Sequence, residues 1–316
     1  MSKDTPIEWC DSTVNPVMGC DGCELWDNTV KSCYAGQLHE MRGGQKGYAP
    51  TFKEVTMFPG RMAATLKWKD LTGTDRPDKP WLNRMPRLIF VSDMSDALSH
   101  TVSFDYLKQE IIDVVKGSPH QYLWLTKRPK RMADFADWLG GWPKNLWAGT
   151  SVTDQKTADQ RVPQLLQVPA LVRFLSVEPM LEKIDLKLTK PVPVIDDKYG
   201  DQHEYVEVNR GIRLVIVGGE SGDESRPCQV EWIRDVIMQG QETQAKVFIK
   251  QLGKIPISWG CTKPGQHWPV SDIRPAMSEF EFGGNVLWRH HLHSKKGGDI
   301  TEWPKDLRIR EFPNLK

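Results

Sequence analysis

Six short apolar runs, each ending in polar or glycine residues, constrain the fold of this chain most strongly. They are rich in Val, Ile, Phe and Trp and too short for helices, so they predict buried strands. The runs lie at 87–96, 121–129, 146–152, 172–179, 213–222 and 246–253. The stretches 104–117 and 230–239 carry apolar residues at helical spacing. Strand–helix alternation predicts an α/β fold of parallel strands, a partial or full TIM-barrel-like β/α barrel with irregular insertions.

Polar residues gather where the predicted strands end. Because ligands bind at the carboxyl ends of parallel strands, we expect these side chains to line one polar mouth. The residues are Ser92, Asp93, Thr126, Lys127, Arg128, Thr150, Ser151, Ser176, Glu178, Gly218, Gly219, Glu220, Ser221, Lys250 and Gln251. Among them, Ser92, Thr126 and Ser151 are candidate contacts for a bound cofactor.

Composition sets the broad class of the protein. The chain has 316 residues, 42 basic and 41 acidic, so no global charge draws it to nucleic acid or membrane. No apolar run could span a bilayer, and the first ten residues are not of signal-peptide type, so we expect a cytoplasmic protein. We expect a barrel with its N-terminal cysteine loop over 1–253 and an irregular C-terminal extension over 254–316. The polar stretch 186–211 looks like an insertion, a lid or a hairpin.

The cysteines gather near the N-terminus. Four of the six precede residue 34, which in a reducing compartment favours a metal site over disulfides. Cys20 and Cys23 form a C-x-x-C pair, and Cys33 follows after nine residues. A helix that begins near residue 34 would place Cys33 in its first turn, where the helix dipole favours a thiolate.

Three metal states fit this pattern. Structural zinc takes four ligands, and Cys10 and His39 are the candidates for the fourth. Three cysteines without a fourth suit a [4Fe–4S] cluster with one open iron, which can bind S-adenosylmethionine through its amine and carboxylate. The third alternative is that the cysteines carry no metal. The iron–sulfur reading is preferred.

The order of several motifs resembles a known family. The motifs are IEWCDSTVNPVMGC, CYA, FVSDMSD, LTKRPKRM, TSV, FLSVEPML, VIVGGESG, RPCQVEWIRD and VFIKQLG. Over 7–253 the chain resembles uncharacterised, largely phage-associated proteins with a three-cysteine motif, which look related to the radical S-adenosylmethionine superfamily. The resemblance implies a barrel with Cys20, Cys23 and Cys33 on a [4Fe–4S] cluster, S-adenosylmethionine across the strand ends, and Tyr34 near the adenine. The spacing C-x2-C-x9-C departs from the superfamily's usual C-x3-C-x2-C.

Several strand-end residues have a functional and a structural reading. The glycines Gly218 and Gly219 would let a ligand approach the backbone, with Glu220 on an amine or ribose hydroxyl, or they form a tight turn. Glu178 is a ribose contact or an acid/base group, or else a carboxylate paired to a lysine, for which Lys250 is the expected partner. Lys250 could equally hold a substrate carboxylate or phosphate.

Two further groups of candidate residues lie in the motifs FVSDMSD and LTKRPKRM. Asp93 and Asp96 could bind substrate or orient a neighbouring base, and a helix cap is the alternative for Asp96. Four cations could contact phosphates or begin a solvated helix: Lys127, Arg128, Lys130 and Arg131. The basic stretch 289–296 is predicted as a solvated loop, and Cys228 and Cys261 as packing residues.

These features lead to two functional hypotheses. In the first, an enzyme with an external electron donor cleaves S-adenosylmethionine to a 5′-deoxyadenosyl radical. Its expected substrate is a nucleic-acid base or nucleotide, in phage DNA modification or repair within the host cytoplasm. In the second, a non-enzymatic iron–sulfur or zinc protein binds nucleic acid or a protein partner. The sequence gives no indication of oligomeric state.

Overall fold

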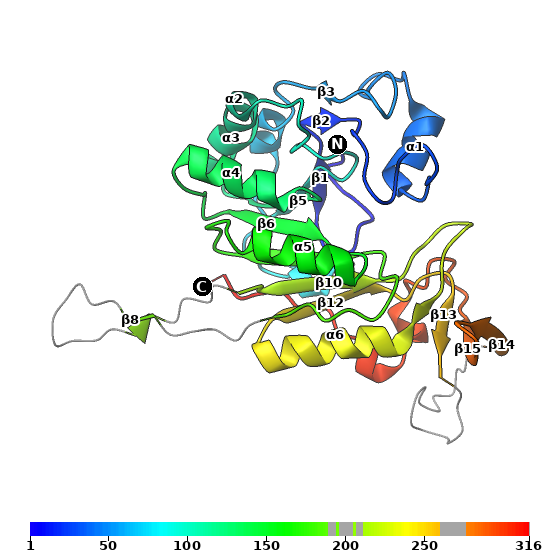
Figure 1. The fold of residues 1–316 in the computed structure, drawn as a ribbon. Helices are drawn as coiled ribbons and strands as arrows, with labels where there is room; N and C mark the ends of the chain where they lie inside the picture. The colour runs from blue at the N-terminus through cyan, green and yellow to red at the C-terminus, as the bar shows by residue number, and fades with distance from the viewer. Residues whose placement is uncertain (189–193, 196–204, 207–210, 260–275, 316) are drawn as a thin grey trace. The chain divides into compact units, whose positions relative to one another are not determined.

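The six predicted strands all form, and a short strand at the N-terminus joins them in one sheet (Figure 1). The computed structural model describes residues 1–188, 194–195, 205–206, 211–259 and 276–315. The strands of the sheet are β1 (Ser12–Val14), β4 (Leu88–Val91), β5 (Gln121–Thr126), β6 (Leu146–Ser151), β7 (Arg173–Val177), β10 (Leu214–Gly218) and β12 (Lys246–Gln251).

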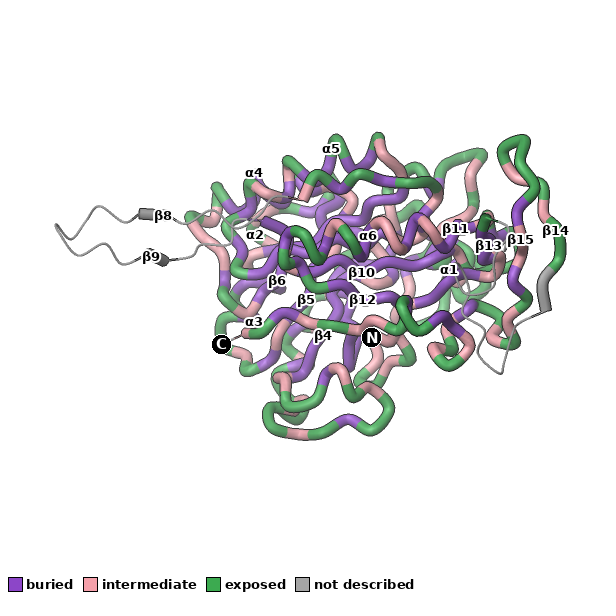
Figure 2. Tube along the Cα trace, turned by 90° about the horizontal axis from the view of Figure 1, so that it is seen from below, coloured by how far each residue is buried: buried purple, intermediate pink, exposed green. Residues whose placement is uncertain are grey.

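Strand order identifies the architecture. The sheet runs β1-β4-β5-β6-β7-β10-β12, so each strand is added beside its predecessor in the chain, and the described pairings are parallel. This singly wound order is that of a TIM barrel. The strands are almost wholly buried, as their apolar runs predicted (Figure 2). The chain therefore has a partial TIM-barrel-like α/β fold.

Helices connect the strands. Between β4 and β5, α2 (Phe104–Leu107), the π-helical turn η3 (Lys108–Ile112) and α3 (Asp113–Lys116) form one helical stretch. The other helices are α1 (Tyr34–Arg42), α4 (Pro129–Leu139), α5 (Gln155–Leu165) and α6 (Val230–Thr243). Both α4 and α6 bury one apolar face, which pins them to the fold. No helix in the described part of the chain is long and apolar enough to cross a membrane.

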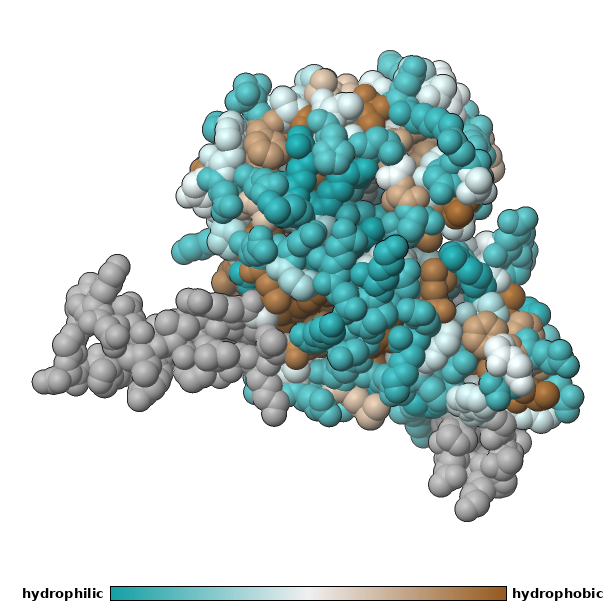
Figure 3. Space-filling model, in the orientation of Figure 1, coloured by the Kyte–Doolittle hydropathy of each residue, from teal (hydrophilic) through white to brown (hydrophobic). Residues whose placement is uncertain are grey.

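The chain divides into two compact units. The first comprises 1–151 and 163–172, and the second comprises 152–162 and 173–316. Short elements complete them: β2 (Val17–Met18), β3 (Thr56–Met57), β8 (Val194–Ile195), β9 (Tyr205–Val206), η1 (Ala63–Lys67), η2 (Pro80–Leu82), η5 (Ile300–Glu302) and η6 (Lys305–Leu307). Strands β8 and β9 pair antiparallel within the predicted insertion, whose other residues between 189 and 210 lie outside the described ranges. Hydrophilic residues cover most of the face drawn in Figure 3.

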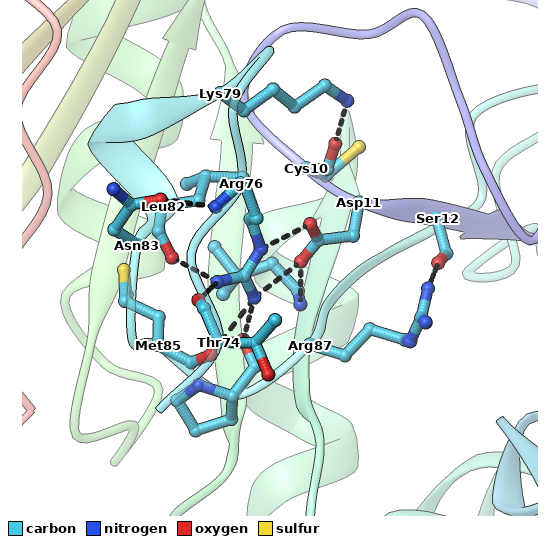
Figure 4. Close-up of polar contacts among 12 residues, drawn as sticks. Cys10, Asp11, Ser12, Thr74, Arg76, Lys79, Leu82, Asn83, Met85 and Arg87 are labelled. Carbon is cyan, nitrogen blue, oxygen red and sulfur yellow. Dashed lines mark hydrogen bonds and ion pairs between the residues drawn. The ribbon is translucent and has the colours of Figure 1, made fainter. Parts of the chain in front are cut away.

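A buried ion pair fastens the first unit before β1 (Figure 4). Arg76 Nε lies 2.7 Å from Asp11 Oδ1, and both side chains are less than a tenth exposed. Asp11 Oδ2 also accepts the Leu88 N–H that begins β4, at 2.8 Å. Lys79 Nζ donates to three backbone carbonyls of the N-terminal segment, at 2.6–2.7 Å. The network therefore fixes where β1 starts, and with it the cysteine loop that follows.

The second unit holds a small sheet that the sequence analysis did not predict. Its order is β11 (Cys228–Gln229), β13 (Pro256–Ser258), β15 (Asn285–His291) and β14 (Ala276–Phe282). Gly283 and Gly284, both at positive φ, join β14 to β15 in a two-residue hairpin. The stretch read as irregular thus contains strands, and the predicted solvated loop at 289–296 is wrong for 289–291. Residues 289–291 form the end of β15 because this strand pairs with β13, and His290 is buried there.

Both outer strands of the large sheet are covered. Ser2 exchanges backbone hydrogen bonds with Thr13 of β1, at 2.8 and 3.0 Å. On the other edge, the segment 309–311 bonds to Val247 and Ile249 of β12, at 3.0 and 2.9 Å. Each end of the chain therefore pairs with the strand that would otherwise lie open.

Candidate functional site

The three clustered cysteines lie on one compact turn of the first unit. Gly22, between the C-x-x-C pair, has φ +95°, which residues with a side chain rarely adopt. Cys23 and Trp26 exchange backbone hydrogen bonds, at 2.9 and 3.0 Å, and the Cys33 N–H donates to Leu25 O at 2.9 Å. Cys33 is the N-cap of α1, as predicted. The loop therefore returns on itself and brings Cys33 back toward the pair.

A single apolar cluster supports all three thiols. Cys20, Cys23 and Cys33 are half-buried and pack against buried Met18, Trp26, Ala35, Ala49, Phe52 and Met94. The contact with α1 is close, because a Cβ on Gly36 would lie 2.4 Å from the Trp26 ring. Five cysteines of the described residues are free thiols, these three among them. The arrangement is a reduced three-thiol site with an apolar floor.

Burial keeps two of these thiols protonated. It raises the pKa of Cys20 to about 11, and it also raises the pKa of Cys33. Backbone N–H groups of Gly36 and Ala35, at the start of α1, act in the opposite direction on Cys33. Since the thiolate is the metal ligand, a metal would have to displace these protons.

Two cations after β5 contact the cysteine loop. Lys127 Nζ donates to Cys23 Sγ at 3.3 Å and lies 3.6 Å from Glu24 Oε1. Arg128 pairs with Asp21 and donates to Gly22 O at 3.3 Å. Two of the four cations predicted to touch phosphate thus hold the loop instead of facing solvent.

Asp96 joins the ends of β4 and β5 to this loop. Its carboxylate accepts from Thr126 Oγ1 at 2.8 and 2.9 Å and from the Lys127 N–H at 2.9 Å, and it pairs with Arg128 Nη1 at 2.9 Å. It also accepts the Leu98 N–H at 3.0 Å, which closes a turn. The predicted helix cap at Asp96 is wrong, because the next helix, α2, begins at Phe104 and is capped by Ser103. The hydroxyl of Thr126, a predicted cofactor contact, therefore donates its hydrogen bond to Asp96.

The other two cations lie on the first turn of α4. Lys130 forms an exposed i,i+4 pair with Asp134. Arg131 donates to Val102 O at 2.6 Å and lies over the Phe104 ring. Their contact with phosphate stays a prediction.

The end of β4 is polar and enclosed. Asp93 accepts from Asn15 Nδ2 at 2.6 Å, and burial raises the pKa of its carboxyl. The neighbouring Ser92 is 5% exposed, has φ +72°, and its hydroxyl finds no hydrogen-bond partner among the described residues. The Tyr34 hydroxyl donates to the Asp93 carbonyl, which links the start of α1 to this strand end. Ser151 is buried at the end of β6.

Both residues considered as a fourth metal ligand have partners elsewhere in the first unit. The His39 Nε2 atom lies 3.1 Å from Ala49 O, with its ring against Tyr48 and Phe52. Cys10 is buried and its carbonyl accepts from Lys79. Over the described ranges, no three His, Cys, Asp or Glu side chains stand as a ready metal site. A metal at the three cysteines would therefore have to draw the sulfurs together.

In the second unit, Glu178 and Lys250 form the expected pair. Lys250 Nζ lies 3.0 Å from Glu178 Oε1, and the two side chains are 24% and 13% exposed. Ser176 Oγ donates to Glu178 Oε2 at 3.3 Å. A Cβ on Gly218 would stand 3.0 Å from Glu178 Oε1, so the glycine gives the carboxylate its room. The two side chains form an ion pair at the ends of β7 and β12.

Comparison of the sequence with known proteins places it in a family. A family model described as "Protein of unknown function (DUF5131)" matches residues 4–292, which is most of the chain. The chain belongs to the DUF5131 family. No curated protein and no solved structure matches it.

In this DUF5131 member the remaining candidate residues have partners within the chain. Glu220 accepts from Arg226 three times, through Nε and the backbone N–H at 2.8 Å and through Nη2 at 2.6 Å. A Cβ on Gly219 would meet Leu252 O at 2.4 Å, so the glycine serves close chain packing. A ligand amine at Glu220 would have to compete with Arg226.

Sequence reasoning missed three groups of the DUF5131 site. Asp21 accepts from Ser99 Oγ at 2.6 Å as well as pairing with Arg128, and Asn15 bonds both Asp93 and the Met94 N–H. Glu24 faces Lys127. One sequence signal could have identified Asp21 and Glu24. Each directly follows a cysteine in Cys-Asp-Gly-Cys-Glu, and their charge is opposite to that of Lys127 and Arg128.

Proposed function

We propose that this protein binds a [4Fe–4S] cluster through Cys20, Cys23 and Cys33 and uses it to cleave S-adenosylmethionine reductively. The observation that carries the proposal is the packing of three free thiols on one apolar cluster, with Lys127, at the end of β5, donating to Cys23 Sγ. Thiolates are the protein ligands of iron–sulfur clusters, and an apolar floor limits access of water. When bound, the cluster would supply one electron to the sulfonium of S-adenosylmethionine.

The chain's own residues would bind and orient the cosubstrate. The buried Ser92 hydroxyl would gain a hydrogen-bond partner in a polar group of the ligand, which favours binding there. Asp93, held by Asn15, offers a carboxylate to an ammonium group, and an ammonium would in turn favour its charged form. Tyr34 is half exposed and tethered to the Asp93 carbonyl, which supports a place beside the adenine.

The substrate proposed is a nucleic-acid base or nucleotide. Lys130 and Arg131 support it, because they stand on the first turn of α4 with Lys130 largely exposed. The Glu178–Lys250 pair is proposed as the acid/base couple for proton transfer to substrate. A supplied oligonucleotide that raises formation of 5′-deoxyadenosine would support this substrate class, and no response to any nucleotide would reject it.

The cluster is tested by anaerobic reconstitution of wild type and of Cys20→Ala, Cys23→Ala and Cys33→Ala, with Cys228→Ala as control. Cys228 is a buried free cysteine of the second unit, so the control removes a thiol without touching the site. We expect iron and sulfide to be bound by wild type and the Cys228→Ala control but not by the three other variants. With dithionite and S-adenosylmethionine, wild type and control should both form 5′-deoxyadenosine. One zinc and no iron per chain would favour the non-enzymatic alternative. Iron without 5′-deoxyadenosine would reject the radical reaction.

A further inference from the structure

Two consecutive basic residues directly after β5 contact the cysteine loop. Strand β5 ends at Thr126 and α4 begins at Pro129, so Lys127 and Arg128 occupy the turn between them. Their side chains are only 19% and 15% exposed. Charges so shielded from water act on their neighbours more strongly than surface charges do.

The loop presents a matching pattern of charge. Carboxylates follow both cysteines of the pair, as Asp21 and Glu24. Arg128 pairs with Asp21, and Lys127 with Glu24 at 3.6 Å. Arg128 Nη1 also pairs with Asp96 Oδ2 at 2.9 Å, and the Asp96 carboxylate in turn accepts a hydrogen bond from Thr126 Oγ1. Ion pairs therefore connect the end of β5 to the cysteine loop at two positions.

One of these two cations also reaches a thiol. Lys127 Nζ donates directly to Cys23 Sγ at 3.3 Å. The ammonium group that pairs with Glu24 therefore also contacts the sulfur of the neighbouring cysteine.

We infer that Lys127 and Arg128 form a cationic clamp, which fixes the loop 20–24 and sets the reduction potential of the cluster at this site. The inference rests on the proposed function for its second half. Reduction adds one electron to a centre held by three thiolates, and nearby positive charge stabilises the more negative state. Hydrogen bonds to ligating sulfur act in the same direction. Removing the clamp should therefore weaken cluster binding and lower the potential.

The test compares Lys127→Gln with Lys130→Gln, two lysines three positions apart, of which only the first contacts the loop. In the metal-free protein, Lys127→Gln should speed amide hydrogen exchange at 22–24 several-fold, and Lys130→Gln should not. After reconstitution, Lys127→Gln should bind iron about tenfold more weakly and show a more negative midpoint potential. Lys127→Arg keeps the charge and should restore most of the potential.

The outcomes separate the two proposals. If wild type binds no iron, the proposed function fails, and exchange in the metal-free protein alone decides whether the clamp holds the loop. If iron binds and Lys127→Gln leaves the potential unchanged, the clamp does not set it. Unchanged exchange at 22–24 would overturn the loop-fixing role. Arg128→Lys supplies a second variant that preserves charge but loses the double contact with Asp21 and Asp96.

Discussion

Lys250 and Glu178 face each other at the ends of two strands, with 3.0 Å between ammonium and carboxylate. Each side chain is largely buried, so removing one partner leaves a charge without its counter-ion. Lys250→Met should lower the free energy of unfolding by about 3 kcal/mol. The double variant with Glu178→Gln should recover most of that loss. Urea unfolding of the four proteins measures the coupling, and strictly additive losses would argue against a paired role.

The Arg76–Asp11 pair predicts a strong effect on folding. Arg76→Lys keeps the charge but cannot reproduce the fork that binds both carboxylate oxygens and the carbonyls of Met85 and Pro86. We expect a loss of about 3 kcal/mol in thermal or urea unfolding. Lys108→Met, which removes an exposed pair with Asp113, should cost under about 1 kcal/mol. Equal losses in the two variants would contradict this account of the network.

Helix α1 tests how tightly the cysteine loop is packed. Gly36→Ala would drive a methyl group against Trp26, which the floor of the site cannot absorb without moving. It should destabilise the protein by about 1–3 kcal/mol and reduce iron loading. Gly117→Ala is the control, since its Cβ would find no atom closer than 3.8 Å. The prediction fails if Gly36→Ala unfolds at the wild-type denaturant concentration.

His290 makes stability depend on pH. Burial, followed by the Arg234 and His291 charges, lowers its pKa from 6.5 to about 4, and its Nε2 lies 2.7 Å from Ser258 Oγ. The unfolded chain binds the proton more readily, so the free energy of unfolding should fall as pH drops from 6.5 toward 4. The contribution lost is about 3 kcal/mol. It should vanish in His290→Gln and persist in His293→Gln, whose imidazole is exposed. Parallel pH slopes in all three proteins would contradict it.

Six strands of the large sheet could be predicted because each contains a short run of mostly apolar residues, a pattern that is visible without tertiary information. Strand β1 was not predicted because Ser12–Val14 is three residues long and contains one apolar residue, Val14. The hairpin β14–β15 carried a readable Gly-Gly turn, but its polar residues masked the alternation. Lys127 and Arg128 looked like a free basic patch because sequence shows charge without showing which carboxylates fold against it. The Glu178–Lys250 pair could be predicted because both residues stand at the carboxyl ends of strands of one parallel sheet and carry opposite charges.

Pairing of Ser2 with β1 and of 309–311 with β12 has a consequence for self-association. An open sheet edge presents unpaired N–H and C=O groups that can recruit another chain. Here the backbone near each end of the chain occupies such an edge. Deleting residues 309–311 would therefore expose the backbone of β12 as a template for edge-to-edge aggregation, while the strand itself remained intact.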